Sequence, residues 1–121
     1  MLQKLKGSFC FKREERLTGK DKIKEVFSKG KRTGCRGAKL FVLKNNLSQN
    51  RVCFTFPKGF AGAAERNRTK RLGREAYRNL KPCIKKGYDI VFIVYPGNPE
   101  ITFEGRLKQL RYLFNGAGLL Q

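Results

Sequence analysis

Apolar residues recur along this chain at different spacings, and the spacing predicts which segments are helices. Between residues 19 and 29 they fall three or four positions apart, which predicts a short helix with Thr18 as its N-cap and Gly30 at its C-terminal end. The longest predicted helix covers residues 63–80, and Pro82 ends it because proline cannot continue a helix.

Three other segments carry the patterns of β-strands. Residues 39–44 are an apolar run between two lysines, and residues 51–58 include alternating apolar and polar side chains. Residues 45–50 are rich in Asn and Ser, so the two strands are predicted to form an antiparallel hairpin. Residues 89–95 contain a continuous, largely β-branched apolar run, which predicts a strand buried on both faces or in the centre of the sheet.

The last segment completes an α+β pattern. A third helix begins after Asn98 or Thr102, so the order is helix, strand, strand, helix, strand, helix. This order predicts one central sheet with helices packed on it. A length of 121 residues allows one core but not two, so we expect a single domain. It would cover residues 1–121, with residues 1–15 as an N-terminal arm and a core at about 16–115.

Charge narrows the kind of partner. The chain carries 28 Lys and Arg residues against 9 Asp and Glu residues, a formal net charge of +19. Such a domain repels itself unless a polyanion neutralises it, so nucleic acid is the leading partner, ahead of acidic proteins and anionic membranes. No stretch approaches the ~20 apolar residues that span a bilayer, and the N-terminus lacks a signal-peptide pattern, so we expect a cytoplasmic protein.

The composition also excludes several kinds of site. The chain has no histidine, which excludes histidine-based catalytic triads and leaves a zinc finger almost without ligands. Its cysteines never form a CxxC pair, and we expect all four to be free thiols: Cys10, Cys35, Cys53 and Cys83. The acidic residues form no DxD-type pair, which disfavours a nuclease that holds metals with carboxylates.

Basic residues are concentrated on the longest predicted helix. Residues 66–78 contain six basic residues and one acidic residue, and five of the six are arginines. The i, i+4 spacing places four of them on one face: Arg66, Lys70, Arg74 and Arg78. A solvated helix would intersperse acidic residues, whereas guanidinium groups match phosphate oxygens bidentately. We therefore interpret this helix as an RNA-binding surface with a buried stripe behind it: Thr69, Leu72, Gly73, Ala76 and Leu80.

A second candidate surface combines aromatic rings with lysines. Six phenylalanines lie on the arm, the first helix and the predicted hairpin: Phe9, Phe11, Phe27, Phe41, Phe54 and Phe56. Exposed rings beside lysines would stack on the bases of a single-stranded nucleic acid. A small domain also needs phenylalanines in its core, so we expect roughly half of these rings to be buried. Phe27 and Phe41 are the best candidates for groove positions.

The basic segment carries a recognisable motif. The run Arg66-Asn67-Arg68-x-Lys70-Arg71-Leu72-x-Arg74-Glu75 resembles the RNR signature of the bacterial ribonuclease P protein family. The likeness extends over about residues 13–114 and includes the first helix, the strands and the last helix. It implies an α+β fold of the ribosomal protein S5 domain 2-like type, in which a βαβ crossover places the RNR segment against a catalytic RNA.

The resemblance also implies a function. The family's protein is the small subunit of a ribonucleoprotein that removes the 5′ leader from precursor tRNA. The expected partners are therefore a catalytic RNA subunit and precursor tRNA, with no membrane and no required protein oligomer. The RNA performs the hydrolysis with magnesium, which it mainly holds itself, so the family implies no catalytic side chain in the protein. No metal ligand on the protein can be named from the sequence.

Two sets of residues match the family's binding positions. The positions that contact the catalytic RNA correspond to Arg66, Asn67, Arg68, Lys70, Arg71 and Arg74. The positions of the leader-binding cleft correspond to Ile23, Phe27, Phe41 and Lys58. Ile23 stands where the family usually has Phe, which removes one possible stacking ring. A ribosomal or other structural RNA-binding protein that uses the same helix is the alternative.

Overall fold

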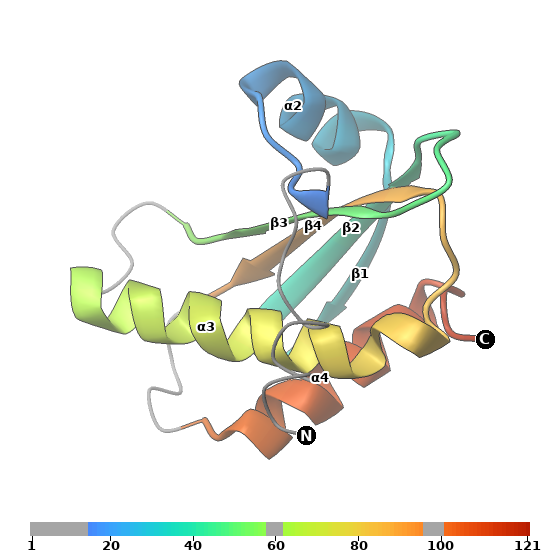
Figure 1. The fold of residues 1–121 in the computed structure, drawn as a ribbon. Coiled ribbons are helices and arrows are strands. Elements are labelled where there is room, and N and C mark those ends of the chain that lie inside the picture. The colour runs from blue at the N-terminus through green and yellow to red at the C-terminus, as the bar shows by residue number, and fades with distance from the viewer. Residues whose placement is uncertain (1–14, 58–61, 96–100) are drawn as a thin grey trace.

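The computed structural model describes residues 15–57, 62–95 and 101–121 (Figure 1). The bounds of its helices and strands are, in chain order, Lys20–Lys29 for α2, Lys31–Cys35 for β1, Ala38–Lys44 for β2, Arg51–Thr55 for β3, Ala63–Leu80 for α3, Tyr88–Val94 for β4 and Phe103–Gly116 for α4. One 3₁₀ turn, η2 at Lys81–Cys83, follows α3 directly. The predicted arm, except for Glu15, lies outside the described residues.

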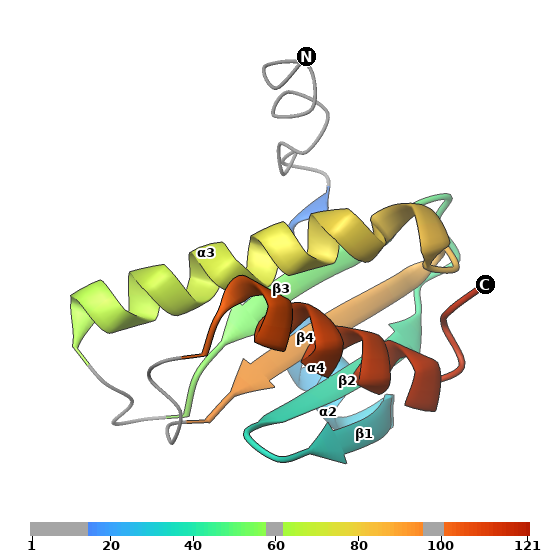
Figure 2. The ribbon, with the colours of Figure 1, turned by 90° about the horizontal axis from the view of Figure 1, so that it is seen from below.

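The four strands form one sheet in the order β1-β2-β4-β3 (Figure 2). Strand β2 is antiparallel to both β1 and β4, whereas β3 is parallel to β4. The apolar run of β4 suits this position, because Ile90 pairs with Val42 on one side and with Val52 on the other. The predicted central strand is therefore confirmed, and α3 is the crossover that joins the parallel strands β3 and β4.

The predicted hairpin of residues 39–44 and 51–58 is wrong. Strands β2 and β3 are not neighbours, because β4 lies between them. The turn-rich connection instead meets the start of β4, where the Asn50 side chain accepts a 2.8 Å hydrogen bond from the backbone N–H of Tyr88. A strand that is apolar on both faces is favoured in the centre of the sheet, where helices cover both faces, and this preference outweighs the local preference for a hairpin.

The edge strand β1 is absent from the sequence prediction. It pairs with β2 across a two-residue turn, Arg36-Gly37, in which Gly37 has a φ of 85°. Its residues are only exposed or half-buried, so it carries none of the apolar alternation that predicts a strand. The Arg-Gly pair is the one local signal that could have predicted this hairpin.

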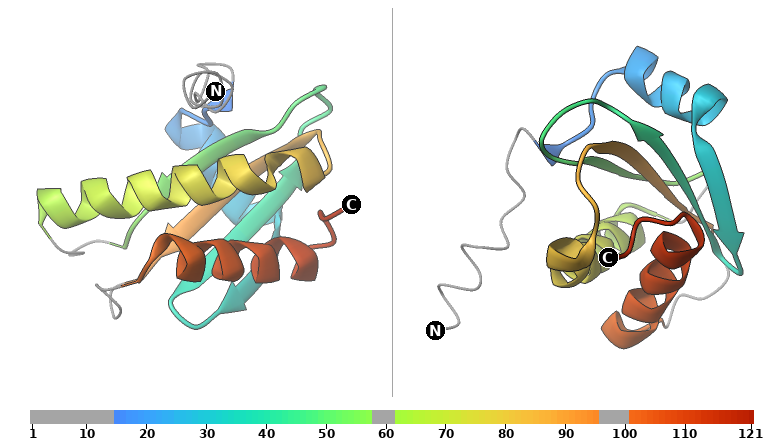
Figure 3. Two further views of the ribbon diagram at one scale, coloured as in Figure 1. Left: turned by 60° about the horizontal axis from the view of Figure 1, so that its bottom comes forward. Right: turned by 90° about the vertical axis from the view of Figure 1, so that its right-hand side faces the viewer.

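The helices cover the two faces of the sheet unequally. Figure 1 and Figure 3 show α3 and α4 on one face, which we call the closed face, and α2 on the other, which we call the open face. The closed face holds the main core, whose largest fully buried side chains include Leu40, Ile90, Phe92, Tyr77, Leu110 and Phe114. On the open face, the fully buried side chains among the described residues are Leu17, Val26 and Val91.

The ends of α2 differ from the prediction. Its N-cap is Gly19 rather than Thr18, and no side chain caps the helix. Gly30 ends the helix as predicted, but with an extended backbone (φ −78°) rather than a left-handed one. A Cβ at Gly30 would collide with the carbonyl oxygen of Val26 and lie 2.9 Å from that of Val42. Glycine is therefore required by the close approach of α2 to β2.

Helix α4 and the residues after it close the core. Thr102 caps α4 as predicted, with its hydroxyl oxygen accepting a backbone hydrogen bond of 3.1 Å, while Asn98 lies outside the described residues. Ala117 and Leu119 are buried, so the core continues beyond the expected limit at about residue 115.

Candidate nucleic-acid interface

Helix α3 separates a buried stripe from a basic surface. Its buried residues are Thr69, Gly73, Ala76, Tyr77 and Leu80. This agrees with the predicted stripe, except that Tyr77 joins it and Leu72 is only half-buried. A Cβ at Gly73 would lie 2.9 Å from the ring of Phe54, so this glycine allows the ring of a strand residue to touch the helix backbone. The stripe fixes which side of α3 remains available to a partner.

The predicted RNA-contacting residues are distributed around the rest of α3. Arg66, Asn67 and Arg71 are exposed. Lys70 and Arg74 are half-buried, and the Nζ of Lys70 lies 5.9 Å from the centroid of the Phe56 ring. Lys70 therefore marks the edge of α3 that faces the end of β3.

Arg68 lies on a different side of α3, toward α4. Its guanidinium forms a 3.4 Å ion pair with Glu65 and donates a 3.2 Å hydrogen bond to the carbonyl oxygen of Ile101. Arg68 thus connects the start of α3 to the start of α4. The motif places Arg66 and Arg68 together in sequence, but Arg68 is half-buried by this second role.

The open face holds three of the four predicted leader-binding residues. The Phe27 ring is 39% exposed and meets the Phe41 ring edge-on, with centroids 4.9 Å apart and planes at 78°. Ile23 is half-buried beside the small core between α2 and the sheet. Lys58 lies outside the described residues. The structure therefore brings Ile23, Phe27 and Phe41 together.

Strand alternation decides which other phenylalanines belong to the core. Phe54 packs edge-on against Phe92 in the closed face, with ring centroids 5.7 Å apart, and Phe56 packs on the same core. Cys53, the residue before Phe54 in β3, points to the opposite face and packs with Phe41 against the open-face core. Phe9 and Phe11 lie outside the described residues.

A partly buried ion pair at the end of the sheet is a feature that the sequence did not predict. Arg51 donates two hydrogen bonds of 2.7 Å to the two carboxylate oxygens of Asp89, its neighbour in the parallel register of β3 and β4. Asn45 donates a third to Asp89, at 2.9 Å. The hydrogen bonds with Asp89 raise the pKa of the Arg51 guanidinium. Arg51 thus fastens the sheet, and only the register, which follows from the topology, could have revealed this pair.

The described residues offer no metal-binding cluster. Within residues 15–57, 62–95 and 101–121, no three His, Cys, Asp or Glu side chains lie together. Cys35, Cys53 and Cys83 are free thiols, as expected, while Cys10 lies outside the described residues. Burial raises the pKa of the Cys53 thiol, which favours the protonated and unreactive form.

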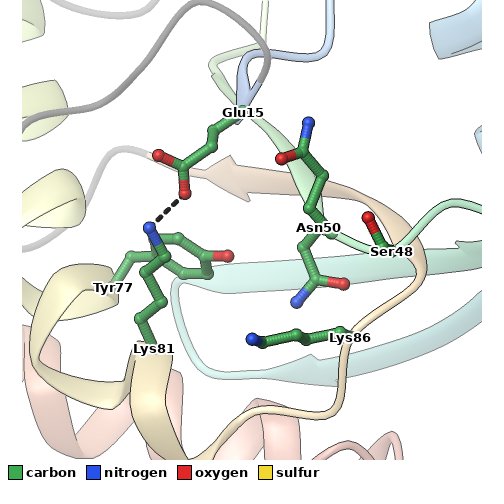
Figure 4. Close-up of a pocket in the computed structure, with 7 residues that line it drawn as sticks. Glu15, Ser48, Asn50, Tyr77, Lys81 and Lys86 are labelled. Atoms are coloured by element: carbon green, nitrogen blue, oxygen red, sulfur yellow. Dashed lines mark ion pairs between the residues drawn. The ribbon is translucent and has the colours of Figure 1, made fainter.

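A polar pocket of about 250 Å³ lies where α3 meets the segment that precedes α2 (Figure 4). Its lining residues are Glu15, Ser48, Gln49, Asn50, Tyr77, Lys81 and Lys86. Glu15, which is buried, forms an ion pair with Lys81 across this pocket. The side-chain amide of Asn50 donates a 2.9 Å hydrogen bond to the backbone carbonyl oxygen of Lys85. The Glu15–Lys81 pair attaches the segment that precedes α2 to the end of α3.

The family model described as Ribonuclease P matches residues 11–118. The chain belongs to the ribonuclease P protein family. A ribonuclease P protein component of Clostridioides difficile is 35% identical over 104 residues, which cover 85% of this chain and 91% of that protein. One of Borrelia turicatae is 36% identical over 93 residues, 76% of this chain and 82% of that protein.

Solved ribonuclease P protein structures share this fold. The protein from Thermotoga maritima superposes with a TM-score of 0.77 at 27% identity, covering 84% of this chain and 96% of that one. The protein from Staphylococcus aureus superposes with a TM-score of 0.79 at 20% identity, covering 88% of this chain and 98% of that one. The predicted α+β fold with its βαβ crossover is therefore confirmed.

Membership in the ribonuclease P family makes this chain a protein component of a ribonuclease. The motif that indicated this family lies on α3. In the part of the chain that the structure describes, no helix is both long enough and apolar enough to cross a membrane.

Proposed function

We propose that this chain binds the RNA subunit of ribonuclease P through α3 and supports removal of the 5′ leader from precursor tRNA. The observation that carries the proposal is the two-sided character of α3. A stripe of five buried residues fixes the helix on the sheet, while Arg66, Asn67 and Arg71 are exposed. Guanidinium groups held in this way suit the phosphates of a folded RNA.

The open face takes the single-stranded leader in this proposal. Phe27 and Phe41 are partly exposed, and a base can stack on an aromatic ring that remains accessible. Lys39 lies two residues before Phe41 on the same face of β2, with its Nζ 5.3 Å from the centroid of the Tyr95 ring. A cation on the same face as exposed aromatic rings favours a negatively charged strand with unpaired bases.

Hydrolysis belongs to the RNA and to magnesium in this proposal. Magnesium prefers carboxylate and other oxygen ligands. The described residues contain no group of three or more His, Cys, Asp or Glu side chains that could hold a metal ion. The protein's own contribution is electrostatic and positional. It neutralises RNA phosphates along α3 and orients the leader on the open face.

Reconstitution with the cognate catalytic RNA at low magnesium tests this function. The protein is expected to raise the rate of precursor cleavage and to tighten binding of precursor over mature tRNA. No effect on either quantity would contradict the proposal. Binding to ribosomal RNA with equal strength would favour a structural RNA-binding protein, and cleavage without the RNA subunit would favour an independent nuclease.

A single-residue variant sharpens the test. Arg66→Ala is expected to weaken binding to the catalytic RNA and to lower the slope of log affinity against log salt by about 0.7–0.9 if one phosphate contact is lost. Arg111→Ala removes an exposed arginine from α4 and is the matched control. Equal slopes for the two variants would move the RNA contact away from the start of α3.

A further inference from the structure

Three arginines meet between α3 and the segment that precedes α2. Arg74 and Arg78 are one turn apart on α3, and both are half-buried. Arg16 approaches them from residues 15–17, which run beside β3 (Figure 1). Burial lowers the pKa of the Arg74 guanidinium, and the positive charges of Arg16 and Arg78 lower it further. Arg74 therefore lies within the field of two further arginines, one from the same helix and one from the segment that precedes α2.

This cluster lacks a counter-charge in the described part of the protein. No carboxylate among residues 15–57, 62–95 and 101–121 forms an ion pair with Arg16, Arg74 or Arg78. The Nε of Arg78 is buried and has no hydrogen-bond partner there. A buried donor without an acceptor is costly, and so is a set of like charges. Both costs are removed by a ligand that is anionic and accepts several hydrogen bonds.

The fold fixes Arg16 in this position. The backbone N–H of Leu17 donates a 3.0 Å hydrogen bond to the carbonyl oxygen of Val52, and Arg16 forms a parallel bridge with Val52. On the other side of Arg16, buried Glu15 pairs with Lys81 at the end of α3 (Figure 4). With both neighbours anchored, the backbone of Arg16 cannot move away from α3 to relieve the repulsion.

We propose that Arg16, Arg74 and Arg78 form a binding site for one phosphate group of the RNA backbone. The inference rests on the proposed function and extends the α3 surface: Arg74 already matches an RNA-contacting position of the family, whereas Arg16 and Arg78 are added to it. Guanidinium groups donate in a planar fork that matches phosphate oxygens, and three forks can surround one phosphate. The site requires residues from the N-terminal segment and from α3, so it exists only in the folded protein.

Salt-dependent binding to the catalytic RNA tests the site. Arg16→Gln and Arg78→Gln are each expected to weaken binding about tenfold, the lower end of the range for loss of one charge-assisted hydrogen bond. The double variant is expected to lower the log–log salt slope by about 0.7–0.9, the value for one phosphate. Arg111→Gln, which removes one exposed charge from α4, is expected to change the affinity less than twofold, since a charge remote from the site acts only through the screened field.

Two results would overturn the site while leaving the proposed function intact. One is that wild-type protein supports leader removal but Arg16→Gln and Arg78→Gln bind RNA like Arg111→Gln. The other is a double variant whose slope falls by twice the single-phosphate value, which would assign the arginines to separate phosphates. Thermal unfolding checks that each variant is folded. Arg16→Gln changes an exposed side chain and keeps the test valid if Arg78→Gln does not fold.

A phosphate titration tests the site if the proposed function itself fails. In full-length protein labelled with ¹⁵N arginine, inorganic phosphate is expected to shift the Nε–H resonance of Arg78 in a saturable way. The same titration of Arg16→Gln is expected to show a weaker effect. A shift that is unsaturable, or equal in wild type and Arg16→Gln, would contradict the site whatever RNA the protein binds.

Discussion

The two faces of the sheet differ in how completely helices cover them. Leu40, Ile90 and Phe92 on the closed face are at most 1% exposed beneath α3 and α4. On the open face α2 has only ten residues, and Phe41, Cys53 and Ile93 remain partly exposed beside it. One face therefore provides most of the core, while the other keeps apolar and aromatic surface available.

This difference separates stability from binding. A domain of this size needs one well-packed core, and the closed face supplies it. Because folding does not depend on full coverage of the open face, its rings can stay partly exposed for a ligand. Partly exposed aromatic rings on a sheet, close to lysines, are typical of surfaces that bind single-stranded nucleic acid.

Truncation of one ring on each face gives the largest expected contrast. Phe92→Ala removes a ring that is 1% exposed and is expected to lower the free energy of unfolding by about 3–5 kcal/mol. Phe41→Ala removes a half-buried ring and is expected to cost about 1–2 kcal/mol. Urea unfolding followed by circular dichroism measures both. Equal losses would show that the open face contributes to folding as much as the closed face.

Tyr77 on the closed face provides a pH test of intermediate size. Burial raises its pKa to about 12 from a usual value of 10.0, with nearby Glu15 acting in the same direction. Between these values the unfolded chain has lost the phenol proton that the folded protein retains, so stability falls as pH rises. The loss approaches about 2–3 kcal/mol by the folded-state pKa, at ~1.4 kcal/mol for each pH unit.

The measurement compares unfolding midpoints of wild type and Tyr77→Phe from about pH 9 to 11. Phenylalanine keeps the ring in the core but has no proton to lose, so the wild type is expected to lose stability relative to Tyr77→Phe as the pH rises. Lysines titrate in the same range in both proteins, and their contribution cancels in the difference. A constant difference across the range would mean that Tyr77 ionises equally easily in the folded and unfolded states.

The elements were largely predictable from the sequence, but the order of the strands was not. Helix α3 and strand β4 follow from local periodicity, and both lie within two residues of their predicted bounds. The hairpin failed because pairing is decided by where β4 inserts, and β4 follows β3 only after the whole of α3. Strand β1 was missed because an edge strand with exposed side chains does not need an apolar pattern.

For the candidate site too, local patterns predicted some features, and contacts between distant elements could not be predicted. The basic surface of α3 was predictable because helical spacing fixes which residues share a side. The positions of Arg68 and Arg16 were not predictable, because each depends on a second element. Arg68 points toward α4 and bonds Ile101. Arg16 is held near Arg74 by the pairing of its segment with Val52 in β3. Contacts between elements distant in sequence carry no local signal.

Phe27 gives the smallest expected change in stability and the most specific change in function. Its ring is already 39% exposed, so Phe27→Ala is expected to cost about 1 kcal/mol, chiefly the edge-on contact with Phe41. Loss of one base stack is expected to reduce the preference of the reconstituted complex for precursor over mature tRNA about tenfold. Binding assays with both tRNAs measure this ratio, with Phe54→Leu as a closed-face control that is expected to leave it unchanged. An equal loss of binding for precursor and mature tRNA would instead assign Phe27 to packing of α2 on the sheet.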